Sequence, residues 1–250
     1  MNYLEAAKAY YAQWTDVPTQ ALNQPRILAV QSSKRDSLQP GYSRPFNLFC
    51  LVRHHTVIIS YSATLQDKMP AIMKTFETSK ALQDREIHLK RVFPNLSHLI
   101  KFNYQGPPPS IDLSDVVELR LNHYDQFLRF FKNHAPDCDA ETWLFEYYGS
   151  LVERGYAFGI FKNDELISAT DAPDIPYMNE IIVEIGINTL EAYRGKGYAK
   201  LVVTAMLKHL LHTGKVPIWS CGASNRGSER LALSVGYQRF ADILCTSPEK

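Results

Sequence analysis

Cysteine is scarce in this chain, with four residues among 250. None of them forms a Cys-x-x-Cys pair, and no group of histidines and cysteines has the spacing of a zinc site. His209 and His212 lie three apart on a predicted helix, but no third ligand is near them in the sequence. We therefore expect no metal, and reduced, mostly buried thiols in a cytoplasmic protein.

Long apolar runs and an excess of charge are also missing. No stretch approaches the ~20 apolar residues of a membrane span, and we expect no signal peptide because the first residues lack its basic and apolar regions. Lys and Arg number 27 against 26 Asp and Glu, a formal net charge of +1. This balance indicates neither a nucleic acid nor a membrane surface as partner. A chain of 250 residues that is 45% hydrophobic can bury a full core and is long enough for two domains.

Proline gathers at one place in the middle of the chain. The segment 105–110 contains three consecutive prolines, which favour a stiff extended connector and exclude a helix or a central strand. The sequence thus predicts a smaller N-terminal α+β domain over 1–105, a Pro-rich linker over 106–111 and a second domain over 112–250. The N-terminal part shows no catalytic constellation. Its predicted helices are 2–14, 65–78 and 80–92, and its predicted strands are 26–30, 47–52, 56–61 and 99–104.

The second domain mixes strands and helices, so the fold class is α/β with α+β character. The β-branched residues between 182 and 187 suit a buried strand. A basic loop with two glycines follows it, and then a helix whose apolar residues are spaced for one buried face. Strands are predicted over 116–121, 156–161, 165–171, 217–221 and 237–246, and helices over 123–133, 142–154, 198–212 and 227–235.

The basic loop at 194–199 has the composition of a phosphate site. N–H groups that converge at a helix N-terminus, with cationic side chains around them, attract anions. A P-loop requires Ser or Thr after Gly-Lys, but Lys196 is followed by Gly197. A dinucleotide fingerprint requires a third glycine at the position of Lys200. The pattern that remains is Arg/Gln-x-x-Gly-x-Gly/Ala, which Arg194, Gly197 and Ala199 fulfil.

At these residues the sequence resembles the GNAT superfamily of N-acetyltransferases. Asn225, Ser228 and the pair Gly236-Tyr237 follow at the spacing of that family, so the resemblance covers about residues 112–246. It implies a splayed central mixed sheet, with acetyl-CoA as cosubstrate and no metal. The residues that it implies for coenzyme A binding are Ile187, Asn188, Thr189, Arg194, Gly195, Lys196, Gly197, Tyr198, Ala199, Asn225, Ser228 and Arg230.

The proton-transfer groups are less fully specified by the sequence. A carboxylate within an apolar strand is costly to bury unless it has a partner or a catalytic role. Glu184 is therefore the first hypothesis for the catalytic base. The alternative is that Glu184 forms an ion pair with a basic side chain. Glu180 is the second hypothesis. Many GNAT enzymes place a tyrosine seven residues after the asparagine, where this chain has Ala232. The catalytic residues predicted are therefore Glu184 and, as a proton donor, Ser228, with Tyr193 or water as alternatives for the donor.

Three functions remain open from the sequence. The first is transfer of an acetyl group from acetyl-CoA to the primary amine of a small molecule, by direct attack in a ternary complex. The second is a non-catalytic acyl-CoA-binding regulatory module, and the third is transfer of a longer acyl chain. The aromatic residues Trp143, Tyr147 and Tyr148 lie near several acids and could receive the amine. The N-terminal domain is expected to cover the acceptor entrance or to form a homodimer near it.

Overall fold

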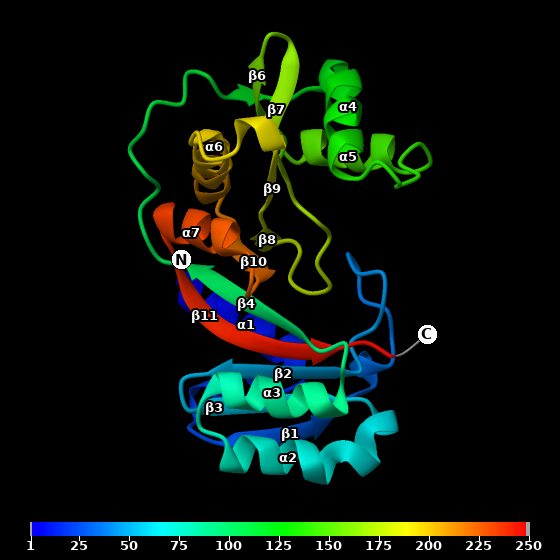
Figure 1. The fold of residues 1–250 in the computed structure, drawn as a ribbon. Coiled ribbons are helices and arrows are strands. Elements are labelled where there is room, and N and C mark those ends of the chain that lie inside the picture. Colours follow the sequence, from blue (N-terminus) through cyan, green and yellow to red (C-terminus); the bar gives the residue numbers. More distant parts are fainter. Residues whose placement is uncertain (1, 249–250) are drawn as a thin grey trace.

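A seven-stranded mixed sheet passes through most of the molecule (Figure 1). The computed structural model describes residues 2–248. Among the strand pairs of these residues, only β1–β3 and β8–β10 are parallel. In spatial order the strands are β1 (Ile27–Gln31), β3 (Thr56–Tyr61), β2 (Leu48–Arg53), β11 (Tyr237–Thr246), β4 (Ser97–Tyr104), β10 (Val216–Gly222) and β8 (Ile182–Glu184).

A second, four-stranded antiparallel sheet lies at the other end of the molecule. In Figure 1 helix α6 covers one face of this sheet, and α4 and α5 lie on the other. Helix α7 packs beside β10 and β11. The strands are β5 (Val117–Glu118), β6 (Phe158–Lys162), β7 (Glu165–Asp171) and β9 (Gly186–Thr189), and the helices are α4 (Tyr124–His134), α5 (Leu144–Glu153), α6 (Tyr198–His212) and α7 (Arg226–Ser234).

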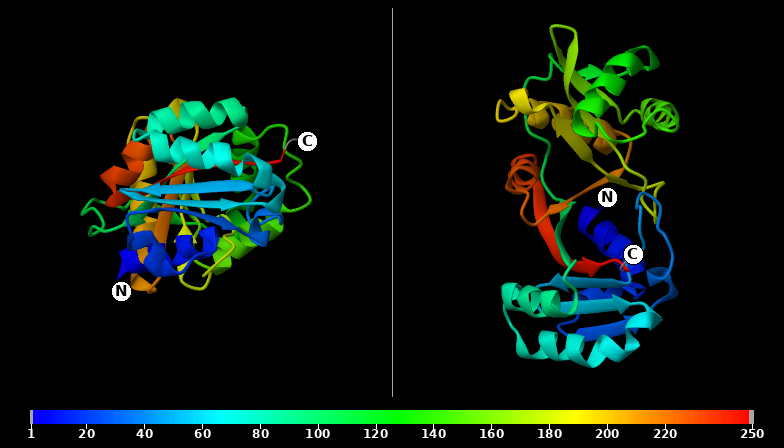
Figure 2. Two further views of the ribbon diagram at one scale, coloured as in Figure 1. Left: turned by 90° about the horizontal axis from the view of Figure 1, so that it is seen from below. Right: turned by 45° about the vertical axis from the view of Figure 1, so that its right-hand side comes forward.

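The N-terminal helices sit on opposite faces of the larger sheet. Helix α1 (Tyr3–Thr15) packs on one face with residues of β8, β10 and β11, whereas α2 (Met69–Thr78) and α3 (Leu82–Val92) cover the other face of β1–β3. The left view of Figure 2 shows this arrangement. Helix α2 starts later than the predicted 65, after a 3₁₀ turn at Ala63–Lys68, because its proline fits only the first turn of an α-helix.

The larger sheet includes strands from both sides of the proline segment. Strand β4 lies before that segment and is inserted between β10 and β11, which lie after it. Residues 105–116 contain neither helix nor strand and return the chain to the small sheet along the outside of the molecule (Figure 2). The division into domains at 106–111 stays a prediction, and three hydrogen-bonded strand pairs cross it: β4 with β10, β4 with β11, and β2 with β11.

Candidate active site

The two sheets separate within one continuous run of residues. Strand β8 pairs with β10 as far as Glu184, opposite Ile218, and the N–H of Ile185 donates to the Ile218 carbonyl at 3.1 Å. From Gly186 onward the chain joins β7 in the small sheet instead. The sequence predicted one strand here, and the structure divides it into β8 and β9. Because β9 turns away from β10, the predicted splayed mixed sheet is confirmed.

The open edge of β9 carries backbone groups that face the gap. Leu190 N–H donates to Ile167 at 2.9 Å, and Asn188 is opposite Ala169, so the even-numbered residues direct their N–H and C=O groups to β7. In an antiparallel pair the intervening residues direct theirs the other way. The backbone groups of Ile187 and Thr189 therefore point away from β7, and an extended ligand could pair with those of Ile187 and with the N–H of Thr189, since the Thr189 carbonyl accepts from Arg194.

The loop before α6 ends in a cluster of unpaired N–H groups. Gly195 and Gly197 have φ of +75° and +90°, the left-handed region that favours glycine. The N–H groups of Lys200 and Leu201 both donate to the Gly197 carbonyl. None of the N–H groups of residues 195–199 donates to another group within residues 2–248. Together with the positive end of the helix dipole, these N–H groups make the loop suited to an anion.

A groove of about 690 Å³ connects this loop with β9 and the start of α7. It is lined by every residue that the resemblance implies for coenzyme A, except Lys196. Lys196 instead directs its Nζ to the Ala192 carbonyl at 3.0 Å. Arg194 is held at the groove by a 3.0 Å bond from its Nε to the Thr189 carbonyl. The groove also includes Tyr193, Lys200, Gly227 and Leu231, which the sequence had not assigned to coenzyme A.

Asn225 and Ser228 form the far wall of the groove. The Asn225 side chain caps α7 by accepting from the Ser228 N–H at 3.0 Å. The indole N–H of Trp219 donates to the Ser228 hydroxyl oxygen at 3.0 Å, which leaves the hydroxyl proton free to be donated. Ala232 is fully buried in α7, so the position of the missing tyrosine presents no side chain to the groove.

The Glu184 side chain projects from β8 to the face of the larger sheet that α1 covers. It is 9% exposed, accepts a hydrogen bond from the Ser220 hydroxyl, and lies 4.0 Å from the Nζ of Lys101. Burial is the largest single effect on Lys101, which is 4% exposed, and it disfavours the charged form, but Glu184 together with nearby tyrosine and cysteine side chains raises the pKa of Lys101 overall. The structure thus contains the ion pair with a basic side chain that was the alternative interpretation of Glu184.

Asp171 is a second carboxylate at the splay, and the sequence had not singled it out. It ends β7 and is opposite Gly186, the first residue of β9. A Cβ added to Gly186 would overlap the Asp171 carboxylate, at 2.6 Å from its Cγ. Burial, with a smaller contribution from Glu184, raises the pKa of Asp171 to about 6. The signal in the sequence was a glycine inside an apolar strand, which often marks a close approach by another group.

Of the remaining residues that the sequence predicted for the acceptor or the base, one lies near Asp171 and the others lie elsewhere. Tyr147 lies near Asp171, and its pKa is raised by burial and by that carboxylate. Tyr148 is buried in the core and donates to the Arg120 carbonyl at 2.7 Å, and Trp143 is 39% exposed. Glu180 is exposed and lines a different cavity, so the structure does not bring it to the splay.

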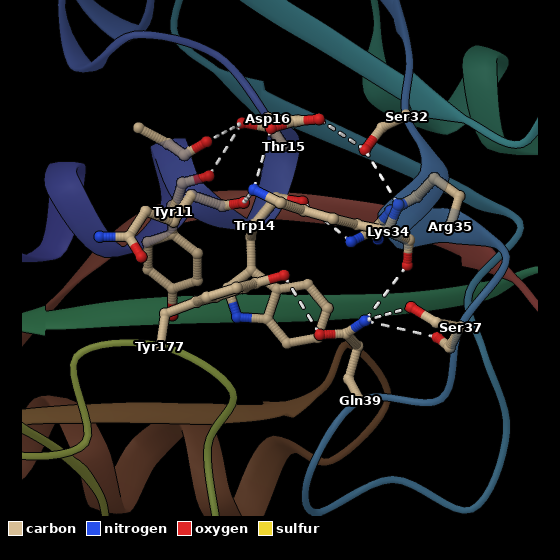
Figure 3. A network of polar contacts seen from close by, with 12 residues as sticks. Tyr11, Trp14, Thr15, Asp16, Ser32, Lys34, Arg35, Ser37, Gln39 and Tyr177 are labelled. Carbon is tan, nitrogen blue, oxygen red and sulfur yellow. Dashed lines mark hydrogen bonds and ion pairs between the residues drawn. The ribbon is translucent and has the colours of Figure 1, made fainter.

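The N-terminal segment closes the face onto which Glu184 projects. Figure 3 shows Tyr177, in the loop between β7 and β8, donating to the Gln39 side chain at 3.1 Å. Arg35 reaches back to the Trp14 carbonyl of α1 at 2.9 Å. The loop after β1 therefore fastens α1 to the loop before β8. Tyr10 of α1 is close enough to Glu184 for that charge to raise its pKa further, beyond the larger effect of burial.

Two features of other protein classes are absent from residues 2–248. No helix there is long and apolar enough to cross a bilayer. No three His, Cys, Asp or Glu side chains are grouped there as metal ligands.

Comparison with known proteins gives concordant matches. A family model described as GNAT acetyltransferase matches residues 115–242, slightly more than half of the chain. An uncharacterized N-acetyltransferase of Bacillus subtilis (strain 168), YdfB, is 28% identical over 100 residues, which are 39% of this chain and only 37% of that relative.

Two solved structures share the fold. A GNAT-family acetyltransferase from Colwellia psychrerythraea has a TM-score of 0.52 at 18% identity, covering 80% of this chain and 81% of its own. A GCN5-related N-acetyltransferase from Sphaerobacter thermophilus has a TM-score of 0.50 at 12% identity, covering 66% of this chain and 58% of its own. With the family model spanning the strands that diverge and the glycine loop between β9 and α6, the chain belongs to the GNAT acetyltransferase family.

Proposed function

We propose that the protein transfers an acetyl group from acetyl-CoA to the primary amine of a small molecule, by direct attack in a ternary complex. One observation carries this proposal: β9 and β10 diverge directly beside a loop with unpaired N–H groups, and one groove joins the two features. Such a groove can hold a diphosphate at one end and an extended thioester arm at the other.

The residues of the groove divide into two sets. The N–H groups of residues 195–199, with Arg194 and Lys196, would bind the diphosphate. The backbone groups of Ile187 and the N–H of Thr189, whose carbonyl already accepts from Arg194, would pair with the pantetheine arm, helped by Asn225 and Arg230. A backbone N–H at the splay would polarise the thioester carbonyl, and one such donor is worth roughly 3 kcal/mol of barrier.

Proton transfer requires groups on both sides of the thioester. An amine arrives largely as the ammonium ion, since its pKa lies near 10. The carboxylates Glu184 and Asp171 lie beside the splay, where they would attract this cation and accept its proton. Ser228, oriented by Trp219, would protonate the leaving thiolate from the groove side.

The first experiment measures coenzyme A binding by calorimetry. Wild type should bind, and Arg194→Ala should weaken binding by about tenfold, the loss of roughly 1.4 kcal/mol from one charged hydrogen-bonding group. Arg91→Ala, which removes an exposed arginine of α3, is the matched control and should bind like wild type. Absence of any binding heat in wild type would refute the coenzyme site.

The second experiment measures thiol release from acetyl-CoA with a set of primary amines. Release with at least one amine supports acetyl transfer. The alternative, a non-catalytic acyl-CoA-binding module, is favoured by the buried Ala232 in place of a tyrosine. It would be established by tight coenzyme A binding without turnover of any amine. The same assay with longer acyl-CoA esters tests the third possibility.

Location and assembly are part of the proposal. All four cysteines are free thiols in the described structure, which suits the reducing cytoplasm where acetyl-CoA is available. A homodimer stays a prediction, and light scattering of the purified chain would measure it.

A further inference from the structure

Two carboxylates share one face of the sheet at the splay. Side chains two apart along a strand point to the same face, so Glu184 and Gly186 face the same way. Asp171 is directly opposite Gly186 in the antiparallel pair and therefore lies on that face as well. The carboxylate of Asp171 occupies the space that a Cβ of residue 186 would fill. The Asp171 carboxylate thus lies directly over the first residue of β9, where the two strands part.

The two carboxylates have different partners. Glu184 accepts from the Ser220 hydroxyl and is paired with the buried Lys101. Asp171 accepts no hydrogen bond from any side chain in residues 2–248, although it is mostly buried. A carboxylate that is already paired with a cation and accepts a hydrogen bond has less capacity to bind a further cation. A carboxylate without such partners can bind an incoming ammonium group.

We infer that, within the proposed acetyl transfer, Asp171 is the residue that binds the acceptor amine and takes its proton, while Glu184 is a positioning charge paired with Lys101. This inference rests on the proposed function and divides between Asp171 and Glu184 the role that the sequence gave first to Glu184. The acceptor class that fits is a cationic primary amine that enters on the α1 side of the sheet.

The protons and electrons balance as follows. The ammonium ion passes one proton through Asp171 to solvent. The neutral nitrogen then forms the C–N bond to the acetyl carbon, the C–S bond breaks, and its electron pair goes to sulfur. The second proton that nitrogen loses neutralises the coenzyme A thiolate by way of Ser228 or water. The products are an amide, free coenzyme A and one proton released.

The groups around Asp171 determine its pH dependence. Glu184 on β8 is negative and raises the pKa of Asp171, adding to the larger effect of burial. Tyr147 on α5 faces it as a neutral phenol, because burial and this carboxylate both raise the pKa of Tyr147. Lys101 on β4 lies behind Glu184 and compensates it in part. Asp171 therefore becomes ionised, and able to accept a proton, as the pH rises through about 6.

The test is a pH profile of kcat/KM in the thiol-release assay, because that ratio reports groups of the free enzyme. Wild type should gain activity as the pH rises through about 6. Asp171→Asn should lower kcat/KM by about 100-fold or more. It should also abolish the rise of activity with pH, which is the acidic limb of the profile. Glu184→Gln should keep the limb but move it to lower pH, because loss of the neighbouring negative charge lowers the pKa of Asp171. Asp174→Asn, an exposed acid in the next loop, is the matched control.

Coenzyme A binding by calorimetry shows whether each variant is folded, since neither carboxylate lines the coenzyme groove. Normal binding with the expected kinetics supports the inference. The inference is overturned by the following outcome: wild type releases thiol with an amine, and Asp171→Asn, with normal coenzyme A binding, keeps both the wild-type kcat/KM and its rise with pH. If wild type binds coenzyme A but releases no thiol with any amine, the proposed function fails and this inference fails with it.

Discussion

Replacement of Lys101 by methionine should strongly destabilise the protein. Lys101 and Glu184 are 4% and 9% exposed, and their charged atoms lie 4.0 Å apart. At that distance an effective dielectric constant of 20 gives about 4 kcal/mol of attraction. Loss of one member leaves the other charge buried and unpaired, at a cost of about 3–5 kcal/mol. We expect about 3 kcal/mol because the separation is long for an ion pair, which lowers the Tm by roughly 6–12 °C.

The double variant Lys101→Met/Glu184→Gln separates the ion pair from simple loss of packing. It removes both charges of the pair, and the glutamine carbonyl can still accept from Ser220, so its stability should return to within about 1 kcal/mol of wild type. Lys132→Met is the matched control, since Lys132 forms an exposed pair with Glu141 at 3.2 Å and should contribute less than about 1 kcal/mol.

Urea and thermal denaturation followed by circular dichroism measure these differences. The pair joins a strand before the proline segment to a strand after it, so one cooperative transition should shift as a whole. The reasoning would be refuted if Lys101→Met cost less than 1 kcal/mol, or if the double variant lost the sum of the two single effects.

Three further changes test the loop, a helix cap and a titrating bridge. Gly197→Ala forces a left-handed residue, costs about 1–2 kcal/mol, and should weaken coenzyme A binding in calorimetry more than it lowers the Tm. Asn225→Ala removes the cap of α7 and should cost about 1 kcal/mol in urea denaturation. His98 bridges Asp242 and Glu86 at 2.9 Å, and its bond to Asp242 is the main reason its pKa is raised. That stabilisation is complete below about pH 6.5, the unfolded pKa, and is lost as the pH rises through the folded value. His98→Gln should therefore flatten the pH dependence of Tm above about 6.5.

Local features of the sequence pointed to most of the residues that line the groove between the glycine loop, β9 and α7, and their role in coenzyme A binding stays a prediction. This part of the sequence is recognisable because its features lie within a few residues of one another. They are two glycines with φ of +75° and +90°, a basic loop and an amphipathic helix. The splay itself was implied only by the family resemblance. The strand break at Ile185 was not visible, since β-branched residues suit β8 and β9 equally well.

Asp171 could not be identified from the sequence because its role depends on register. Its place over Gly186 follows from the pairing of β7 with β9, in which a shift of one residue would turn the carboxylate to the other face. Single-sequence reasoning can locate both strands without fixing that alignment. The lone glycine between Ile185 and Ile187 was the available clue, and it acquires meaning only once its cross-strand partner is known.

The N-terminal residues matter to the site for a reason that local patterns do not contain. The prolines at 107–109 indicated a boundary, and no helix or strand crosses them. Yet β4, before the prolines, fills the space between β10 and β11 and carries Lys101 to the carboxylate of Glu184. A strand inserted between two others removes two unpaired edges. The N-terminal part therefore supplies a central strand, the cation that is paired with Glu184, and helix α1, which packs against β8 and β10, so the surroundings of Glu184 depend on both parts of the chain.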